Sequence, residues 1–210
     1  MKGLILKDLY MSVKYCRFYL AISVAFTAFS VLGNNIFFLL YPVLMCATIP
    51  VSLISYDEKS RWNVYAGVLP YSKKEIVSVK YVGTLIFLGI GILLIGISQA
   101  AKMMIYGTFD WKLLGIFITV IPITGLVGPC LMFPAIFKFG AEKGRAVFYG
   151  VIILVCALYG ALGTIVNNPG TAVYVVAKRA WVIPVILVSG LLLLWISWRL
   201  SVHFYQKREL

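Results

Sequence analysis

The sequence alternates long apolar blocks with short charged segments, and this pattern limits the fold more than any other feature. A membrane-spanning helix needs roughly 20 mostly apolar residues, with about 17 to 25 tolerated. Six blocks reach or approach this length: 18–32, 36–56, 81–101, 113–137, 146–166 and 180–198. Only 12% of the 210 residues are charged, whereas soluble domains carry about 25%. We therefore predict an all-α integral membrane protein with six transmembrane helices in one domain, 1–210.

Lysine and arginine are distributed unevenly between the two sides of these spans. Fifteen lie before the first span, after the second, after the fourth and at the end of the sixth: Lys2, Lys7, Lys14, Arg17, Lys59, Arg61, Lys73, Lys74, Lys80, Lys138, Lys143, Arg145, Arg199, Lys207 and Arg208. The other side has four: Lys102, Lys112, Lys178 and Arg179. Because cytoplasmic loops carry the excess of cations, we expect a multi-pass protein of the cell (plasma) membrane with both termini cytoplasmic.

The net charge of +12 would point to nucleic acid in a soluble protein. Here the cations lie between apolar blocks and not on one face, so orientation in a membrane explains them better. We therefore expect membrane lipid as a partner and no nucleic acid.

The N-terminal segment 1–17 has an amphipathic pattern of its own. Apolar and charged side chains would lie on opposite helical faces: Ile5, Leu6, Leu9, Val13 and Cys16 against Lys7, Asp8, Lys14 and Arg17. This pattern predicts an interface helix in the membrane surface, with its cations near anionic headgroups. The alternative is a solvated extension of the first span.

Acidic residues are absent from the predicted apolar spans. They occur only at positions 8, 57, 58, 75, 110, 142 and 209. Ion-coupled transporters usually carry ionisable groups inside the membrane, so this absence argues that any driving energy comes from another protein. The chain has no Gly-x-x-x-x-Gly-Lys-Ser/Thr loop of its own. With one histidine, His203, and no closely spaced cysteines, we expect no metal site, no cofactor and no catalytic motif on this chain.

The fourth span is rich in residues that disturb helices. Pro122, Gly125, Gly128, Pro129 and Pro134 all fall within it. Prolines are tolerated in membranes where neighbouring helices satisfy the freed carbonyl groups. We expect this span to be kinked or locally broken.

The cytoplasmic loop 57–80 is too long and too amphiphilic to be a plain connection. Trp62, Tyr65 and Leu69 would form an apolar stripe on a short helix that Pro70 ends. Ser72 and Glu75 have the spacing of a capping box at the start of the next helix. The short helix would suit docking into a groove of a soluble partner, or its aromatic residues would anchor it at the lipid headgroups. The second cytoplasmic loop, 138–145, is an ordinary charged turn with two glycines.

Taken together, these segments resemble the permease subunits of type-two ATP-binding-cassette exporters, more narrowly a small six-span bacterial branch associated with peptide export or bacteriocin immunity. The resemblance lies in Met1-Lys2-Gly3-Leu4 to Lys7-Asp8, Asp57-Glu58-Lys59, Trp62-Asn63, Leu69-Pro70-Tyr71-Ser72, Lys80-Tyr81, Phe133-Pro134, Lys138-Phe139-Gly140 and Glu142-Lys143-Gly144-Arg145. It covers nearly the whole chain.

The resemblance implies a complex of two permease subunits, identical or different, on two cytosolic ATPase subunits that bind ATP and Mg. It implies a coupling helix at about Glu58 to Ala66 and a second contact in the loop 138–145. Residues expected to contact the ATPase are Asp57, Glu58 and Arg61 as a charged rim, Trp62 and Tyr65 as anchors, and Lys138, Glu142, Lys143 and Arg145. The segment 167–179 leaves little room for the re-entrant helices of larger members.

Span walls rich in Phe, Leu, Ile and Gly suit an amphipathic peptide or a lipid-like substrate. Two other functions stay open on the residues alone. One is a stand-alone secondary transporter, against which the charge-free spans argue. The other is a non-transporting membrane scaffold or immunity protein, against which the elaborate loop 57–80 argues.

Overall fold

The computed structural model describes residues 2–32, 37–107, 111–144, 146, 149–150, 153 and 182–207. Within these ranges the chain is helical and contains no strand. The main helices are α1 (Lys2–Tyr15), α2 (Arg17–Leu32), α3 (Phe37–Lys59), α4 (Trp62–Val68), α5 (Lys73–Ile105), α6 (Trp111–Phe139) and α9 (Val182–Lys207). The predicted fifth span, 146–166, and the segment 167–179 fall almost entirely outside the described residues.

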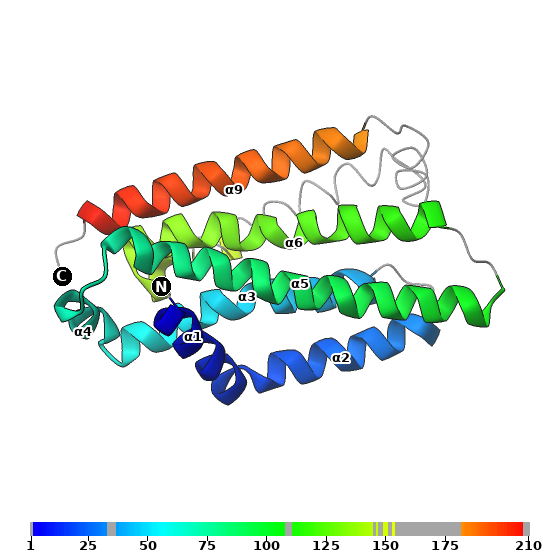
Figure 1. The fold of residues 1–210 in the computed structure, drawn as a ribbon, viewed down its shortest axis with the longest axis horizontal. Helices are drawn as coiled ribbons and strands as arrows, with labels where there is room; N and C mark the ends of the chain where they lie inside the picture. The colour runs from blue at the N-terminus through cyan, green and yellow to red at the C-terminus, as the bar shows by residue number, and fades with distance from the viewer. Residues whose placement is uncertain are drawn as a thin grey trace.

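The described helices α2, α3, α5, α6 and α9 run side by side along the long axis of the molecule (Figure 1). In the middle, α3 and α5 pack against each other, and both contact α1, α2 and α6. The outer helix α9 packs against α6 and α5. The short helix α4 lies at one end, where α3, α6 and α9 finish and α5 begins, while α1 crosses the bundle obliquely near that end (Figure 1). We call this the α4 end.

In the described part of the chain, four helices are long and apolar enough to cross a membrane: α3, α5, α6 and α9. The helix α2 is equally apolar in character but shorter. It does not continue into α1, because the helix is interrupted at Cys16. These elements correspond to five of the six predicted spans. The number six remains a prediction.

The proline-rich helix α6 is continuous, so of the two expected forms the local break is wrong and the kink stays a prediction. It contains Pro122, Pro129 and Pro134 within one helix. A proline frees the carbonyl four residues earlier from its helical hydrogen bond. Before Pro134 that carbonyl belongs to Cys130, and the hydroxyl of Ser197 on α9 donates to it at 2.6 Å. A neighbouring helix therefore satisfies the freed group, as the sequence analysis required.

The same hydroxyl belongs to a buried polar cluster that joins α5 to α9. Tyr81 Oη lies 2.7 Å from Ser197 Oγ and 2.8 Å from Ser201 Oγ. The Tyr81 ring also packs against Phe133 of α6, with ring centroids 4.7 Å apart. Three helices are thus joined at the level of Pro134 by hydrogen bonds and aromatic packing.

The expected single helix from Glu58 to Ala66 is divided in two. The helix α3 continues through Glu58 to Lys59, and α4 begins only at Trp62. Between them Arg61 adopts a left-handed backbone conformation, with φ of 53°, which turns the chain and cannot be part of a right-handed helix. The helix α4 ends at Val68, because Leu69 precedes Pro70 and is extended, with ψ of 151°.

Candidate functional site at the α4 end

A buried cluster of four charged side chains lies at the α4 end. Lys80 Nζ on α5 is 2.9 and 2.8 Å from the two carboxylate oxygens of Asp8 on α1, and 2.6 Å from Asp57 Oδ2 on α3. Lys7 Nζ completes it at 2.8 Å from Asp57 Oδ1 and 3.3 Å from Asp8 Oδ1. Two cations thus face two anions, and the cluster is neutral.

Burial makes this cluster structurally demanding. Asp8, Asp57 and Lys80 are each 6% exposed or less. A charge taken out of water is costly unless it is paired and hydrogen-bonded. The cluster can therefore persist only while α1, α3 and α5 keep their relative positions.

This arrangement corrects the picture of α1 drawn from the sequence. Asp8 was expected on the charged face of this helix, opposite its apolar stripe, but it is buried with Leu4 and Ser12. The outward face instead carries Leu6, Tyr10 and Val13 as exposed residues. The sequence did not reveal the cluster because its members are separated along the chain. The available signal was that Asp57 and Lys80 both border predicted spans.

Lys7 also connects the cluster to α4. Its Nζ lies 4.2 Å from the centroid of the Trp62 ring, within the range of a cation–π contact. Trp62 is partly buried and packs against the main apolar core, and Ala66 on the same side of α4 is 1% exposed. The inner face of α4 is therefore held against the bundle.

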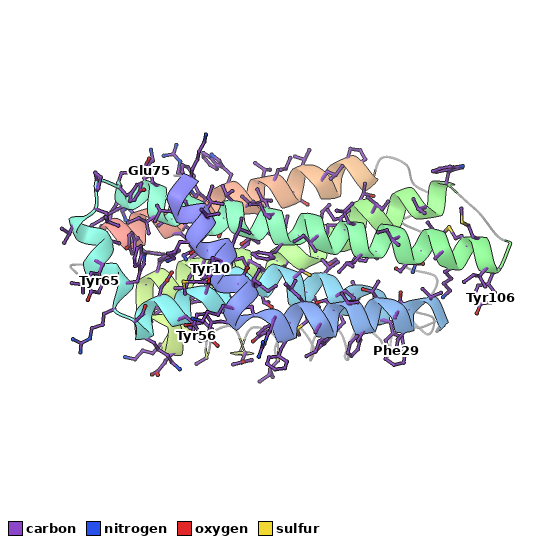
Figure 2. The ribbon with its side chains drawn as sticks, turned by 60° about the horizontal axis from the view of Figure 1, so that its bottom comes forward. Tyr10, Phe29, Tyr56, Tyr65, Glu75 and Tyr106 are labelled. Atoms are coloured by element: carbon purple, nitrogen blue, oxygen red, sulfur yellow. The ribbon has the colours of Figure 1, made fainter. Side chains whose placement is uncertain are left out.

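The outer face of α4 is apolar and uncovered. Val64, Tyr65 and Val68 are 62%, 66% and 87% exposed. Val64 and Val68 are four residues apart and share one side of the helix, and Tyr65 lies around its circumference between Val68 and Trp62. Figure 2 shows Tyr65 at the α4 end, far from Tyr106 at the other end. We call Val64, Tyr65 and Val68 the outer face of α4.

The two predicted cytoplasmic loops meet at the α4 end. The backbone N–H of Ala141 donates to Glu58 Oε2 at 2.7 Å, across 83 positions of sequence. Beside this contact is an open cavity of about 340 Å³. Its lining combines the end of α3 with the loop after α6: Ser55, Glu58, Lys59, Phe139, Gly140, Ala141, Glu142 and Lys143.

The structure also places most of the other residues that were expected to contact the ATPase. Lys138 is exposed, and its Nζ lies over the rings of Phe139 and Phe204, at 4.9 and 5.2 Å from their centroids. Glu142 and Lys143 are exposed. Asp57 faces the interior and Arg61 faces solvent. Arg145 lies outside the described residues.

The start of α5 carries the expected capping box. Ser72 Oγ accepts from the Glu75 backbone N–H at 3.2 Å, and Glu75 Oε2 accepts from the Ser72 backbone N–H at 2.9 Å. The two contacts satisfy two backbone donors of the first turn. They fix the point at which the loop after α4 becomes the longest helix.

Apolar helices of spanning length among the described residues indicate a multi-pass membrane protein. A family model described as "ABC-2 family transporter protein" matches residues 3–206. The chain therefore belongs to the ABC-2 family of transporter proteins, the non-catalytic transmembrane permeases of ATP-binding-cassette exporters. No curated protein and no solved structure matches the chain.

Proposed function

We propose that this chain is the permease subunit of an exporter whose separate ATPase docks on the α4 end from the cytoplasm. Family membership and the uncovered outer face of α4 support this assignment together. An exposed apolar patch beside charged residues is typical of a protein-binding surface. In this proposal the chain has six spans and cytoplasmic termini, works with a second permease subunit, and binds neither ATP nor Mg itself. We place it in the bacterial cell membrane.

The docking surface that we propose differs in part from the sequence-based one. The outer face of α4 with Tyr65 supplies the apolar anchor, and Arg61 lies at its rim. Glu58, Glu142 and Lys143 line the adjacent cavity, with Lys138 in the last turn of α6 and Arg145 in the segment that follows. Trp62 and Asp57 are not part of this surface, because both face the helix bundle.

The contacts behind α4 suggest how a push on this helix would reach the spans. The Trp62 ring contacts Lys7, and Lys7 is part of the ion cluster that holds α1, α3 and α5. A second route passes from Glu58 to Ala141 at the end of α6. Movement of α4 with its ATPase would therefore displace the ends of several helices together, as a rigid-body switch between inward- and outward-facing states requires.

The substrate that we propose is an amphipathic peptide or another hydrophobic molecule. A groove of about 380 Å³ opens between α2, α3 and α6. Its lining is mostly apolar: Tyr19, Leu44, Met45, Thr48, Val51, Ser52, Gly125, Gly128, Pro129, Met132 and Tyr149. None of the described residues that line it carries a carboxylate or an amine, so a hydrophobic surface of the substrate is the group that it would recognise.

Two matched tyrosines provide the test. Tyr65 on α4 and Tyr10 on α1 are 66% and 73% exposed, and Figure 2 labels both. The tagged chain is purified with its ATPase, identified by a Walker A sequence, and reconstituted in proteoliposomes. Because buried interface aromatics commonly contribute more than about 1 kcal/mol, Tyr65→Ala should weaken ATPase binding roughly tenfold, whereas Tyr10→Ala should change it less than about twofold.

Equal effects of the two substitutions would remove the outer face of α4 from the docking surface. Substrate transport in proteoliposomes without any ATPase would instead support a stand-alone secondary transporter. Stable association with no nucleotide-dependent change would support a scaffold or immunity protein.

A further inference from the structure

We propose that Lys74 and Arg199 bind the phosphate group of an anionic phospholipid whose acyl chains lie along the outer face of α9. The site lies where the first turn of α5 meets the last third of α9. The inference depends on the chain lying in a membrane and is independent of the ATPase and of transport.

One tryptophan ring lies within about 6 Å of both cations. Lys74 Nζ is 5.8 Å and Arg199 Cζ is 6.0 Å from the centroid of the Trp198 ring. The indole N–H of Trp198 donates to Ser78 Oγ on α5 at 3.0 Å, which fixes the ring between the two helices. Arg199 also lies 5.2 Å from the Trp195 centroid.

Neither cation has a carboxylate partner within the described part of the chain. The salt bridges there involve Lys7 and Lys80. The sequence of α9 contains no acidic residue. The acid nearest to Lys74 along α5 is Glu75, and its carboxylate already accepts hydrogen bonds from Ser72. Two unneutralised cations beside aromatic rings favour an anionic ligand.

The helix below Arg199 is suited to acyl chains. Val188, Leu192, Trp195 and Ile196 are 56%, 54%, 54% and 51% exposed. Together with Arg199 they follow the three- and four-residue spacing of one helical face. Tryptophans prefer the level of the headgroups, and aliphatic side chains prefer the level of the acyl chains. This order of side chains along one face favours a phospholipid as the ligand. Free phosphate would contact only the two cations and would leave the aliphatic side chains unused.

The experiment titrates the purified full-length chain in mild detergent with dioleoyl phosphatidylglycerol and counts bound lipids by native mass spectrometry. Dioleoyl phosphatidylcholine and inorganic phosphate are separate arms. We expect phosphatidylglycerol to bind at least about tenfold more tightly than phosphatidylcholine, because only it keeps a net negative headgroup. Millimolar inorganic phosphate should not displace it.

Two matched double variants locate the site. Lys74→Gln with Arg199→Gln should weaken phosphatidylglycerol binding at least about tenfold. Lys59→Gln with Lys143→Gln removes two exposed cations from the same end and should change binding less than about twofold. Lys74→Arg, which keeps the charge, should bind as the native chain does.

Three results would overturn the proposal. Equal weakening by both double variants would mean diffuse attraction to the whole charged end. Equal binding of the two lipids would mean that headgroup charge is not recognised. Displacement of the lipid by inorganic phosphate alone would mean that the acyl-chain face of α9 contributes nothing.

Discussion

Lys80 donates to both carboxylate oxygens of Asp8 at 2.9 and 2.8 Å, although 72 positions separate them. This contact fastens the N-terminal helix α1 to α5 and brings Asp57 of α3 into the same ion cluster. The helix α1 is thus tied to the bundle through α5 and α3. Any displacement of α1 must break a buried ion pair.

Removing the central cation should destabilise the protein strongly. Lys80→Met would leave Asp8 and Asp57 buried with only Lys7 between them, at a cost of about 3–5 kcal/mol in the free energy of unfolding. The measurement is denaturant unfolding in detergent. Lys59→Met, an exposed cation at the end of α3, is the control and should cost less than about 0.5 kcal/mol. Similar losses of unfolding free energy in Lys80→Met and Lys59→Met would show that the ion cluster does not hold α1, α3 and α5 together.

The hydroxyl of Ser197 should matter because of Pro134. Ser197→Ala removes the donor to the Cys130 carbonyl and should cost about 0.6–1.7 kcal/mol in unfolding free energy. In a Pro134→Ala background residue 134 regains its N–H, which can satisfy that carbonyl within α6. The same serine substitution should then cost less, and a double-mutant cycle measures the difference. A cost that does not depend on Pro134 would contradict this explanation of the continuous helix.

Gly144 should not accept a side chain. A Cβ there would lie 2.8 Å from Ile136 Cα and 2.9 Å from Ile136 N, and backbone atoms cannot move aside cheaply. Gly144→Ala should therefore destabilise the helical turn that follows α6 by about 1–3 kcal/mol. Gly89→Ala on α5 meets nothing within 4 Å and should be neutral, or stabilising by about 0.5–1 kcal/mol. Thermal unfolding of the two variants compares them directly.

The capping box should slow amide hydrogen exchange at the start of α5. Ser72→Ala removes the side-chain acceptor for the Glu75 N–H, which should cost about 1 kcal/mol of local helix stability. Amide hydrogen exchange at Glu75 and Ile76 should accelerate accordingly. Ser72→Thr keeps the hydroxyl and should leave exchange nearly unchanged. Unaltered exchange in the alanine variant would mean that the box does not stabilise this turn.

The long helices could be predicted from the sequence, because the length of an apolar segment depends only on local composition. The capping box was equally accessible, since Ser72 and Glu75 are three positions apart. The ion cluster was not accessible, because it requires α1, α3 and α5 to converge. The inward direction of Trp62 was also missed: a stripe of apolar residues does not reveal which face the bundle covers. The break at Arg61 depends on a backbone conformation that its residue type does not demand.

The central claim is that an ATPase binds the outer face of α4. The most direct test places a photo-crosslinking amino acid at Val68, which is 87% exposed, or at Met104 near the opposite end, which is 73% exposed. In native membranes the account predicts a crosslink from position 68 to a protein carrying an ATP-binding cassette, and from position 104 none. Crosslinks from position 68 to lipid alone, or a crosslink to the ATPase from position 104, would contradict it.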